Sequence, residues 1–156
     1  MTAAEKIDIL RRKMAELGVD AVILPTSDPH MSEYIPAYWE SRCWFSGFTG
    51  DAGTLVVTKE ASLLWTDGRF FIQAYQQLTG TPIQLMKMRE SGVPTVDEYL
   101  GEHIHNGKVA VDGRLYSEKD AESLQEKLSA AGSMLVSLDL VAEIWTKDRP
   151  ALPATP

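Results

Sequence analysis

Residues 27–71 read SDPHMSEYIPAYWESRCWFSGFTGDAGTLVVTKEASLLWTDGRFF and carry the main signal for the fold. The end of this stretch contains two strand-like runs, Thr54–Thr58 and Ser62–Thr66, with three residues between them. That spacing predicts an antiparallel hairpin. The middle of the stretch is aromatic and rich in glycine, as expected where a backbone turns tightly or approaches another group closely.

The sequence before this stretch predicts one helix and one buried strand. A helix is predicted over Ala3–Leu17 because apolar residues recur at steps of three and four: Ile7, Leu10, Met14 and Leu17. Thr2 is suited to cap the start of this helix, and Gly18 is suited to end it. Ala21–Leu24 is a continuous apolar run, typical of a strand buried on both faces, and Pro25 ends it.

The remaining sequence alternates between helix and strand patterns. Further strands are predicted over Pro82–Met88, Lys108–Val111 and Ser133–Val136. Further helices are predicted over Pro36–Arg42, Phe70–Leu78, Thr95–His103, Ser117–Ala131 and Leu138–Trp145. We therefore expect an α/β fold with a mixed, mainly parallel sheet of about six strands flanked by helices. The strands should be parallel where helices intervene and antiparallel at the hairpin.

Length and composition indicate one globular domain. The chain has 156 residues, and its formal net charge of -7 argues against a nucleic-acid surface and against an anionic membrane as partner. No apolar run approaches about 18 residues, and no secretory signal is visible, which predicts a cytoplasmic protein. The Pro-rich tail predicts that the domain covers residues 1–148 and that residues 149–156 form a linker.

Few residues are candidates for chemistry. The single cysteine, Cys43, excludes an internal disulfide and fits a buried apolar position between Arg42 and Trp44. The alternative, a cysteine nucleophile, lacks a nearby histidine. His103 and His105 either offer two imidazoles to a metal or mark an exposed helix end, and no carboxylate or cysteine stands at ligand spacing. Neither a phosphate-binding loop nor a Gly-x-Ser-x-Gly nucleophile motif is present.

Arg69 is the strongest candidate for a binding residue. It follows the second hairpin strand, and the preceding Asp-Gly turn would direct it out of the sheet. Two interpretations are open: Arg69 engages a carboxylate or a peptide carbonyl, or it forms a local ion pair with Asp67 or Asp51. His30, close to Glu33, either makes a buried structural hydrogen bond or belongs to an interface or an active-site wall.

The stretch SDPHMSEYIPAYWESRCWFSGFTGDAGTLVV, followed by LWTDGRFFIQA, closely resembles the N-terminal domain of Xaa-Pro aminopeptidases (aminopeptidase P) of the three-domain type. The wider family is creatinase/prolidase, and the similarity extends from the first helix to EIWTKDRP. The resemblance implies the creatinase N-terminal, ribonuclease H-like fold. Asp51 is a departure, because the family usually has a small polar residue there, often serine.

The resemblance also implies a division of labour. Full-length relatives remove an N-terminal residue that precedes proline, with two metal ions, usually manganese, in a catalytic domain. The ligands for those metals are absent from these 156 residues. The chain is thus expected to be a non-catalytic first domain with no cofactor of its own, joined by its linker to a second and a catalytic domain. It would position proline-containing peptides against its own catalytic domain and contribute to homodimer contacts.

Residue roles carry over by motif. The arginine of the family motif Asp-Gly-Arg-Tyr/Phe-Phe contacts the bound peptide, which implies this role for Arg69. The glutamate of the Ser-Glu-Tyr motif is tied to full activity, which implies a part in the active-site wall for Glu33; His30 lies in the same motif. Two alternatives remain: a stand-alone binding module with the same fold, and the same domain from a prolidase- or creatinase-type enzyme.

Overall fold

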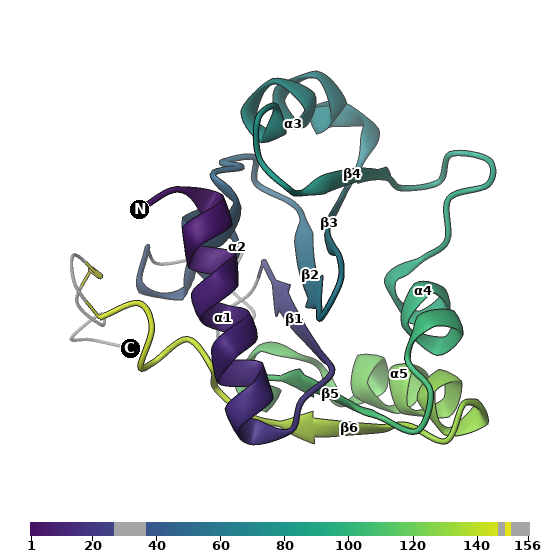
Figure 1. Cartoon of the computed structure of the whole chain (residues 1–156). Helices are drawn as coiled ribbons and strands as arrows, with labels where there is room; N and C mark the ends of the chain where they lie inside the picture. Colours follow the sequence, from purple (N-terminus) through teal and green to yellow (C-terminus); the bar gives the residue numbers. More distant parts are fainter. Residues whose placement is uncertain (27–36, 147–148, 151–156) are drawn as a thin grey trace.

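A six-stranded sheet forms the centre of the molecule, with the strand order β4-β3-β2-β1-β5-β6 (Figure 1). The computed structural model describes residues 1–26, 37–146 and 149–150. The strands are β1 (Ala21–Pro25), β2 (Thr54–Thr58), β3 (Ser62–Thr66), β4 (Gln84–Lys87), β5 (Lys108–Val111) and β6 (Met134–Ser137). The α-helices are α1 (Ala3–Leu17), α2 (Ser41–Ser46), α3 (Phe71–Leu78), α4 (Val96–His103) and α5 (Glu118–Ala130). Three 3-10 helices are η1 (Ala37–Trp39), η2 (Gly68–Phe70) and η3 (Gly113–Leu115).

Strand β1 joins the two halves of the sheet. It pairs antiparallel with β2 on one side and parallel with β5 on the other. The β2–β3 pair is the predicted antiparallel hairpin, with Thr54 opposite Trp65 and Val57 opposite Ser62. Strands β4 and β6 extend the two edges in parallel with β3 and β5. Only β2 therefore runs against the other five strands, which confirms the prediction of a mixed, mainly parallel sheet.

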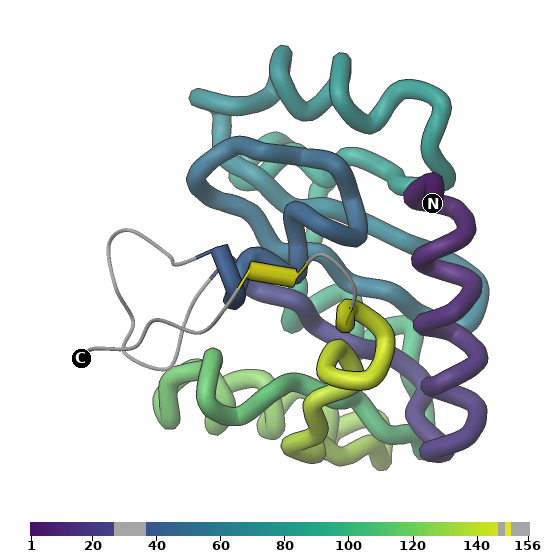
Figure 2. Tube along the Cα trace, turned by 90° about the vertical axis from the view of Figure 1, so that its left-hand side faces the viewer, coloured from purple at the N-terminus to yellow at the C-terminus, as the bar shows by residue number. Residues whose placement is uncertain are grey.

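Helices cover both faces of the sheet. Helices α1, α2 and α3, together with the segment 138–146, lie on one face, and α4 and α5 lie on the other (Figures 1 and 2). The first core includes Ile7, Leu10, Val22, Phe45, Phe48, Leu64, Ala74 and Trp145. The second includes Ile23, Val56, Trp65, Leu100, Val109, Leu124 and Leu128. Neighbouring residues of β1 thus enter different cores, as expected for a strand buried on both faces.

Capping residues in the sequence set the helix boundaries. The Thr2 hydroxyl accepts a hydrogen bond from the Glu5 N–H at 3.2 Å, and the Glu5 carboxylate accepts one from the Thr2 N–H at 3.0 Å. Thr95 and Glu98 form the same capping box at the start of α4. Gly18 ends α1 in the left-handed conformation, at φ 68°. The predicted bounds of α1 are therefore confirmed.

Within the described residues, no helix combines the length and the apolar character that crossing a membrane requires.

Two predictions for the first half of the chain are wrong. Leu17 was expected on the buried stripe of α1 but is 42% exposed, and Val19, just beyond the helix end, is buried instead. The predicted helix over Pro36–Arg42 is not continuous where the structure describes it. Glu40 has non-helical torsions (φ -82°, ψ 47°), so η1 ends before it and α2 begins after it.

The predicted helix over Leu138–Trp145 is also absent. The Asp139 carboxylate accepts hydrogen bonds from the N–H groups of Val141 and Ala142 at 2.9 and 3.2 Å. This is the geometry of an N-cap, so helical bonding can begin only after Asp139 and not at Leu138. Only one turn follows, closed by the Trp145 N–H and the Val141 carbonyl at 2.9 Å. The segment therefore consists of an N-cap and one turn, and Trp145 at the end of that turn is buried in the first core.

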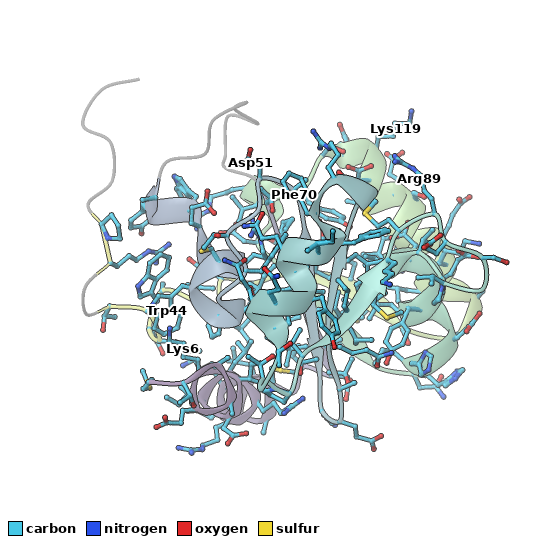
Figure 3. All side chains as sticks on the ribbon, turned by 90° about the horizontal axis from the view of Figure 1, so that it is seen from above. Lys6, Trp44, Asp51, Phe70, Arg89 and Lys119 are labelled. Atoms are coloured by element: carbon cyan, nitrogen blue, oxygen red, sulfur yellow. The ribbon has the colours of Figure 1, made fainter. Side chains whose placement is uncertain are left out.

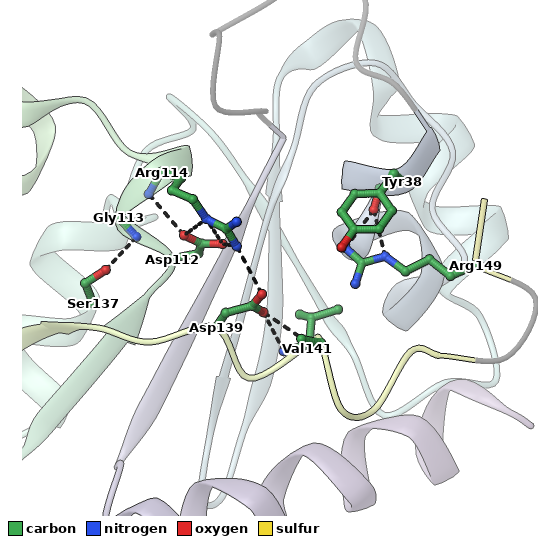
Figure 4. Close-up of polar contacts among 9 residues, drawn as sticks. Tyr38, Asp112, Gly113, Arg114, Ser137, Asp139, Val141 and Arg149 are labelled. Carbon is green, nitrogen blue, oxygen red and sulfur yellow. Dashed lines mark hydrogen bonds and ion pairs between the residues drawn. The ribbon is translucent and has the colours of Figure 1, made fainter. Parts of the chain in front are cut away.

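Arg149, the first residue of the predicted linker, packs against η1. Its Nε and Nη2 atoms donate to the Tyr38 carbonyl at 3.0 and 2.8 Å (Figure 4). Its guanidinium carbon lies 3.6 Å from the centre of the Tyr38 ring. The division into a domain over 1–148 and a linker over 149–156 stays a prediction, but Arg149 itself is attached to the domain.

Candidate functional site

An open groove of about 550 Å³ lies at the sheet edge where the carboxyl ends of the parallel strands meet. Its lining comes from the end of β1, the start of β2, the residues after β3 and β4, and the residues around η3. In open α/β sheets ligands bind at this edge, where loops that follow the strands can surround a ligand without disturbing the sheet. The groove is therefore the candidate site, and the turn that carries Arg69 borders it.

Asp67 holds Arg69 in one orientation. The Asp67 side chain caps η2 by accepting from the Arg69 backbone N–H at 3.0 Å. It also accepts from Nε at 3.1 Å and from Nη2 at 3.0 Å, so the guanidinium is bound along one edge. The Phe70 ring supports the guanidinium, with 5.0 Å between the guanidinium carbon and the ring centre. The Arg69 side chain is nevertheless 74% exposed.

Asp67 and Arg69 each stabilise the charged form of the other, as their pKa shifts show. The hydrogen bond from Arg69 holds the pKa of Asp67 below its ordinary value, although partial desolvation opposes the shift. In return, Asp67 raises the pKa of Arg69, and Asp51 adds a smaller effect in the same direction. The ion pair, one of the two interpretations left open by the sequence, is therefore present, and Asp67 is the partner. Among the described residues, no hydrogen bond involves Nη1 of Arg69, so that nitrogen can donate to a ligand.

The groove itself is acidic. Four aspartates line it: Asp51, Asp67, Asp97 and Asp120. Burial is the main cause that raises the pKa of Asp97, and the nearby Asp120 adds to the effect. An acidic lining favours neutral or cationic groups over free carboxylates. Within the described residues, no group of three histidine, cysteine, aspartate or glutamate side chains is placed to hold a metal ion.

Arg42 organises the glycine-rich loop that forms one wall of the site. Its side chain is only 2% exposed. Nε donates to the Thr26 hydroxyl at 3.1 Å, and the two terminal nitrogens donate to the carbonyls of Phe48 and Gly50 at 2.5 and 2.8 Å. Burial lowers the pKa of Arg42, and Glu40, 3.8 Å from Nη2, partly opposes that effect. These hydrogen bonds replace the hydration that the guanidinium loses.

The patterns in the sequence do not predict this role for Arg42. It stands between Ser41 and Cys43 without any periodicity that marks it as buried. One available signal is its position just before a loop with three glycines. Tight glycine turns leave carbonyl groups without partners in a helix or strand, and a buried arginine can bind several of them at once.

The loop 47–53 is also tied to two neighbouring elements. The Thr66 hydroxyl, at the end of β3, donates to the Ala52 carbonyl at 2.6 Å. The Thr49 N–H donates to the side-chain oxygen of Gln77 in α3 at 2.9 Å. Hydrogen bonds therefore connect the loop to the sheet and to the helix that follows Arg69.

Aromatic packing connects this loop to Arg69. Phe48 is fully buried and lies edge-on to Phe70, with 6.2 Å between the ring centres. Gly50 leaves room for the Phe48 ring, because a Cβ atom at that position would clash with it. Phe70 in turn supports the Arg69 guanidinium. A displacement of the loop 47–53 should therefore shift the Arg69 guanidinium, because the Phe48 and Phe70 rings connect the two.

The sequence offers four other candidates, all histidines except Glu33. His30 and Glu33 fall outside the described residues. His103 stacks on Tyr99, with 3.9 Å between the ring centres, and its Nδ1 is 2.8 Å from the Tyr99 carbonyl. His105 is exposed and its Nε2 is 2.8 Å from the Glu102 carbonyl. His103 is the last residue of α4 and His105 follows it, and neither lines the groove at the carboxyl edge.

Cys43 is partly buried in α2. Burial raises the pKa of its thiol, while Arg42 and Lys6 oppose the shift. Lys6 comes from the neighbouring helix α1. Its Nζ donates to the Trp44 carbonyl at 2.9 Å and lies 4.2 Å from the centre of the Trp44 ring (Figure 3). A raised thiol pKa argues against the nucleophile alternative, because the thiolate is the reactive form.

We expect Cys43 to react about tenfold more slowly with iodoacetamide in the folded domain than in the urea-unfolded chain at the same near-neutral pH. The raised pKa lowers the thiolate fraction, and partial burial limits access. Mass spectrometry of timed samples measures both rates. Faster reaction of the folded domain would revive the interpretation of Cys43 as an activated nucleophile.

The sheet order, with helices on both faces and an aspartate-capped arginine turn at the carboxyl edge, defines an α/β domain with a candidate binding edge. The chain belongs to the Creatinase/Prolidase N-terminal domain family, which matches residues 6–144. This result confirms both the resemblance and the fold class expected from the sequence.

Individual relatives are aminopeptidases. Aminopeptidase P2 of Arabidopsis thaliana is 43% identical in an alignment of length 156 that covers 96% of this chain and 22% of that protein. A probable Xaa-Pro aminopeptidase P of Arthroderma otae is 41% identical in an alignment of length 154 that covers 97% of this chain and 24% of that protein. The crystal structure of X-prolyl aminopeptidase from Caenorhabditis elegans, described as a cytosolic enzyme with a di-nuclear active site, superimposes with a TM-score of 0.88. It is 36% identical, and the match covers 98% of this chain and 27% of that one. The chain thus spans about a quarter of these relatives and corresponds to their N-terminal domain.

Proposed function

We propose that this domain positions peptides at the mouth of the active site of an Xaa-Pro aminopeptidase and performs no chemistry itself. The observation that carries the proposal is Arg69, which is held by Asp67 yet 74% exposed at the carboxyl edge of the sheet. A guanidinium that is already oriented loses little entropy when it donates to a peptide carbonyl. The aminopeptidase relatives, of which this chain matches about a quarter, support the choice of substrate class.

In this proposal the hydrolysis takes place in a catalytic domain outside these 156 residues. The Caenorhabditis elegans relative is described as having a di-nuclear active site. Two divalent ions, which we take to be manganese, would activate a water molecule there for attack on the bond before proline. The domain described above would hold the remainder of the peptide in line with that water.

The proposal extends to assembly and location. We place the complete protein in the cytoplasm, because the Caenorhabditis elegans relative is described as cytosolic. We also infer a homodimer to which this domain contributes contacts. Ile72 and Tyr75 on α3 support this inference, since they are 78% and 70% exposed and apolar residues of that size favour contact with another protein surface. Neither a nucleic acid nor a membrane is part of the proposal.

Peptide hydrolysis tests the proposal. The complete protein that contains this domain should release the first residue from an Xaa-Pro peptide in the presence of manganese, and chromatography of the free amino acid measures the rate. The isolated domain should release none. A matched Xaa-Ala peptide is the control for substrate class. Turnover by the isolated domain would contradict a non-catalytic role, and equal turnover of the two peptides would contradict the substrate class.

A further inference from the structure

The sequence Asp-Gly-Arg occurs twice, at residues 67–69 after β3 and at residues 112–114 after β5. Asp112 caps η3 as Asp67 caps η2, by accepting from the backbone N–H of the arginine two residues later at 3.0 Å. It also accepts from Nε of Arg114 at 3.0 Å and from Nη2 at 2.6 Å (Figure 4). The two turns therefore hold their arginines by the same three contacts.

Both turns lie at the carboxyl edge of the sheet. Three strand spacings separate β3 from β5 in the order β3-β2-β1-β5, and spacings of about 4.8 Å place the turns roughly 14 Å apart before twist is considered. The groove extends between them, with Asp67 in its lining on one side and Leu115 and Tyr116 on the other. An extended peptide covers about 3.3 Å per residue, so about four residues span this separation.

Arg114 has one contact that Arg69 lacks. Its Nη2 also donates to Asp139 at 3.1 Å, and its guanidinium lies 5.0 Å from the centre of the Trp39 ring. These contacts connect η3 to the segment 138–146 and to η1, so a purely structural function must be considered. However, the Arg114 side chain remains 54% exposed. Its Nη1 has no hydrogen bond to the part of the chain that the structure describes.

We propose that Arg114 is a second peptide-binding residue, which donates to a backbone carbonyl about four residues away from the one bound by Arg69. This inference rests on the proposed function of the domain. The charges favour a carbonyl over the peptide's terminal carboxylate. Arg114 already faces two carboxylates, Asp112 and Asp139. A further negative group would be repelled, whereas a neutral acceptor is not.

Peptide length is the variable that tests this role. With the complete protein, kcat and KM are measured for Xaa-Pro peptides of three and eight residues, each as free acid and as amide. Arg114→Ala should raise KM for the eight-residue peptides about tenfold, as expected for loss of a charge-assisted hydrogen bond, and leave kcat unchanged. KM for the three-residue peptides should stay within about twofold, because they do not reach Arg114. Free acid and amide should respond equally.

Two further variants separate binding from structural support. Asp139→Asn keeps Arg114 but weakens its contact with the segment 138–146, so it should not reproduce the length-dependent rise in KM. Arg114→Lys keeps the charge and should restore part of the long-peptide KM. If Arg114→Ala and Asp139→Asn raise KM equally at both lengths, Arg114 is a structural clamp and the inference is overturned. If the wild-type protein cleaves no Xaa-Pro peptide, the proposed function fails and this inference fails with it.

Discussion

Replacing Arg42 with alanine should lower the free energy of unfolding of this domain by about 3 to 5 kcal/mol. The guanidinium is 2% exposed and donates to two carbonyls and one hydroxyl. Removing it leaves the two buried carbonyls, of Phe48 and Gly50, without these donors, at a cost of about 1 to 3 kcal/mol for each unsatisfied group. It also leaves a cavity under the loop 47–53, which the fully buried Phe48 ring can fill only by moving.

Urea denaturation of the isolated domain, followed by tryptophan fluorescence, measures this loss. Arg42→Lys is the matched variant, because an ammonium keeps the charge but cannot reach three acceptors in a planar fork, so an intermediate loss is expected. Arg12→Ala, at an exposed position on α1, should change stability by less than about 0.5 kcal/mol. A loss below about 1 kcal/mol for Arg42→Ala would mean that the loop does not depend on this side chain.

Patterns among residues close in sequence predicted much of the fold. They did not predict the burial of Arg42, which depends on tertiary contacts. The capping boxes at Thr2 and Thr95 involve residues three apart, so the sequence itself contains both partners. The β2–β3 hairpin is similar, because three residues connect its strands. Arg42, in contrast, is buried by carbonyls that become available only once the loop after α2 has folded. Its burial depends on tertiary structure, which a pattern of residue types does not contain.

The antiparallel pairing of β1 with β2 could not be predicted from the sequence, because it too depends on tertiary structure. The residues between them, 26–53, show no regular pattern, so neither the direction nor the register of the pairing follows from the chain. The missing helix at the C-terminal end has a different cause. Apolar residues there have a spacing compatible with a helix, but Asp139 caps the segment from within it, and a single turn, closed by the Trp145 N–H and the Val141 carbonyl, follows the cap.

The sequence singles out Arg69 as a candidate and leaves both Asp67 and Asp51 open as ion-pair partners, and its role in binding stays a prediction. The ion pair between Asp67 and Arg69 follows from two opposite charges on either side of a glycine turn, and the structure contains it. The equivalent turn at residues 112–114 was interpreted only as the end of a strand. Comparing the two Asp-Gly-Arg sequences would have found it, but their location at one edge of the sheet requires the strand order, with β1 and β2 between them.

Arg69→Ala should reduce kcat/KM of the complete protein for Xaa-Pro peptides by about tenfold or more, the loss expected when a charge-assisted hydrogen bond to substrate is removed. The fold should tolerate the change. Arg69 is 74% exposed, and an exposed ion pair such as Arg69–Asp67 contributes little to stability. The melting temperature of the isolated domain should therefore stay close to that of the wild type. Kinetics that match the wild type would remove Arg69 from the site.

Asp67→Asn is the informative companion, because it keeps the guanidinium and removes the charge that orients it. An asparagine oxygen can still cap η2 by accepting the Arg69 backbone N–H, whereas the two-point contact with the side chain is lost. If Arg69 acts because it is oriented in advance, Asp67→Asn should lower kcat/KM by an amount between the wild type and Arg69→Ala. If positive charge alone matters, Asp67→Asn should equal or exceed the wild type, since it removes a competing carboxylate. Steady-state kinetics of the two variants on one Xaa-Pro peptide therefore separate orientation from charge at this position.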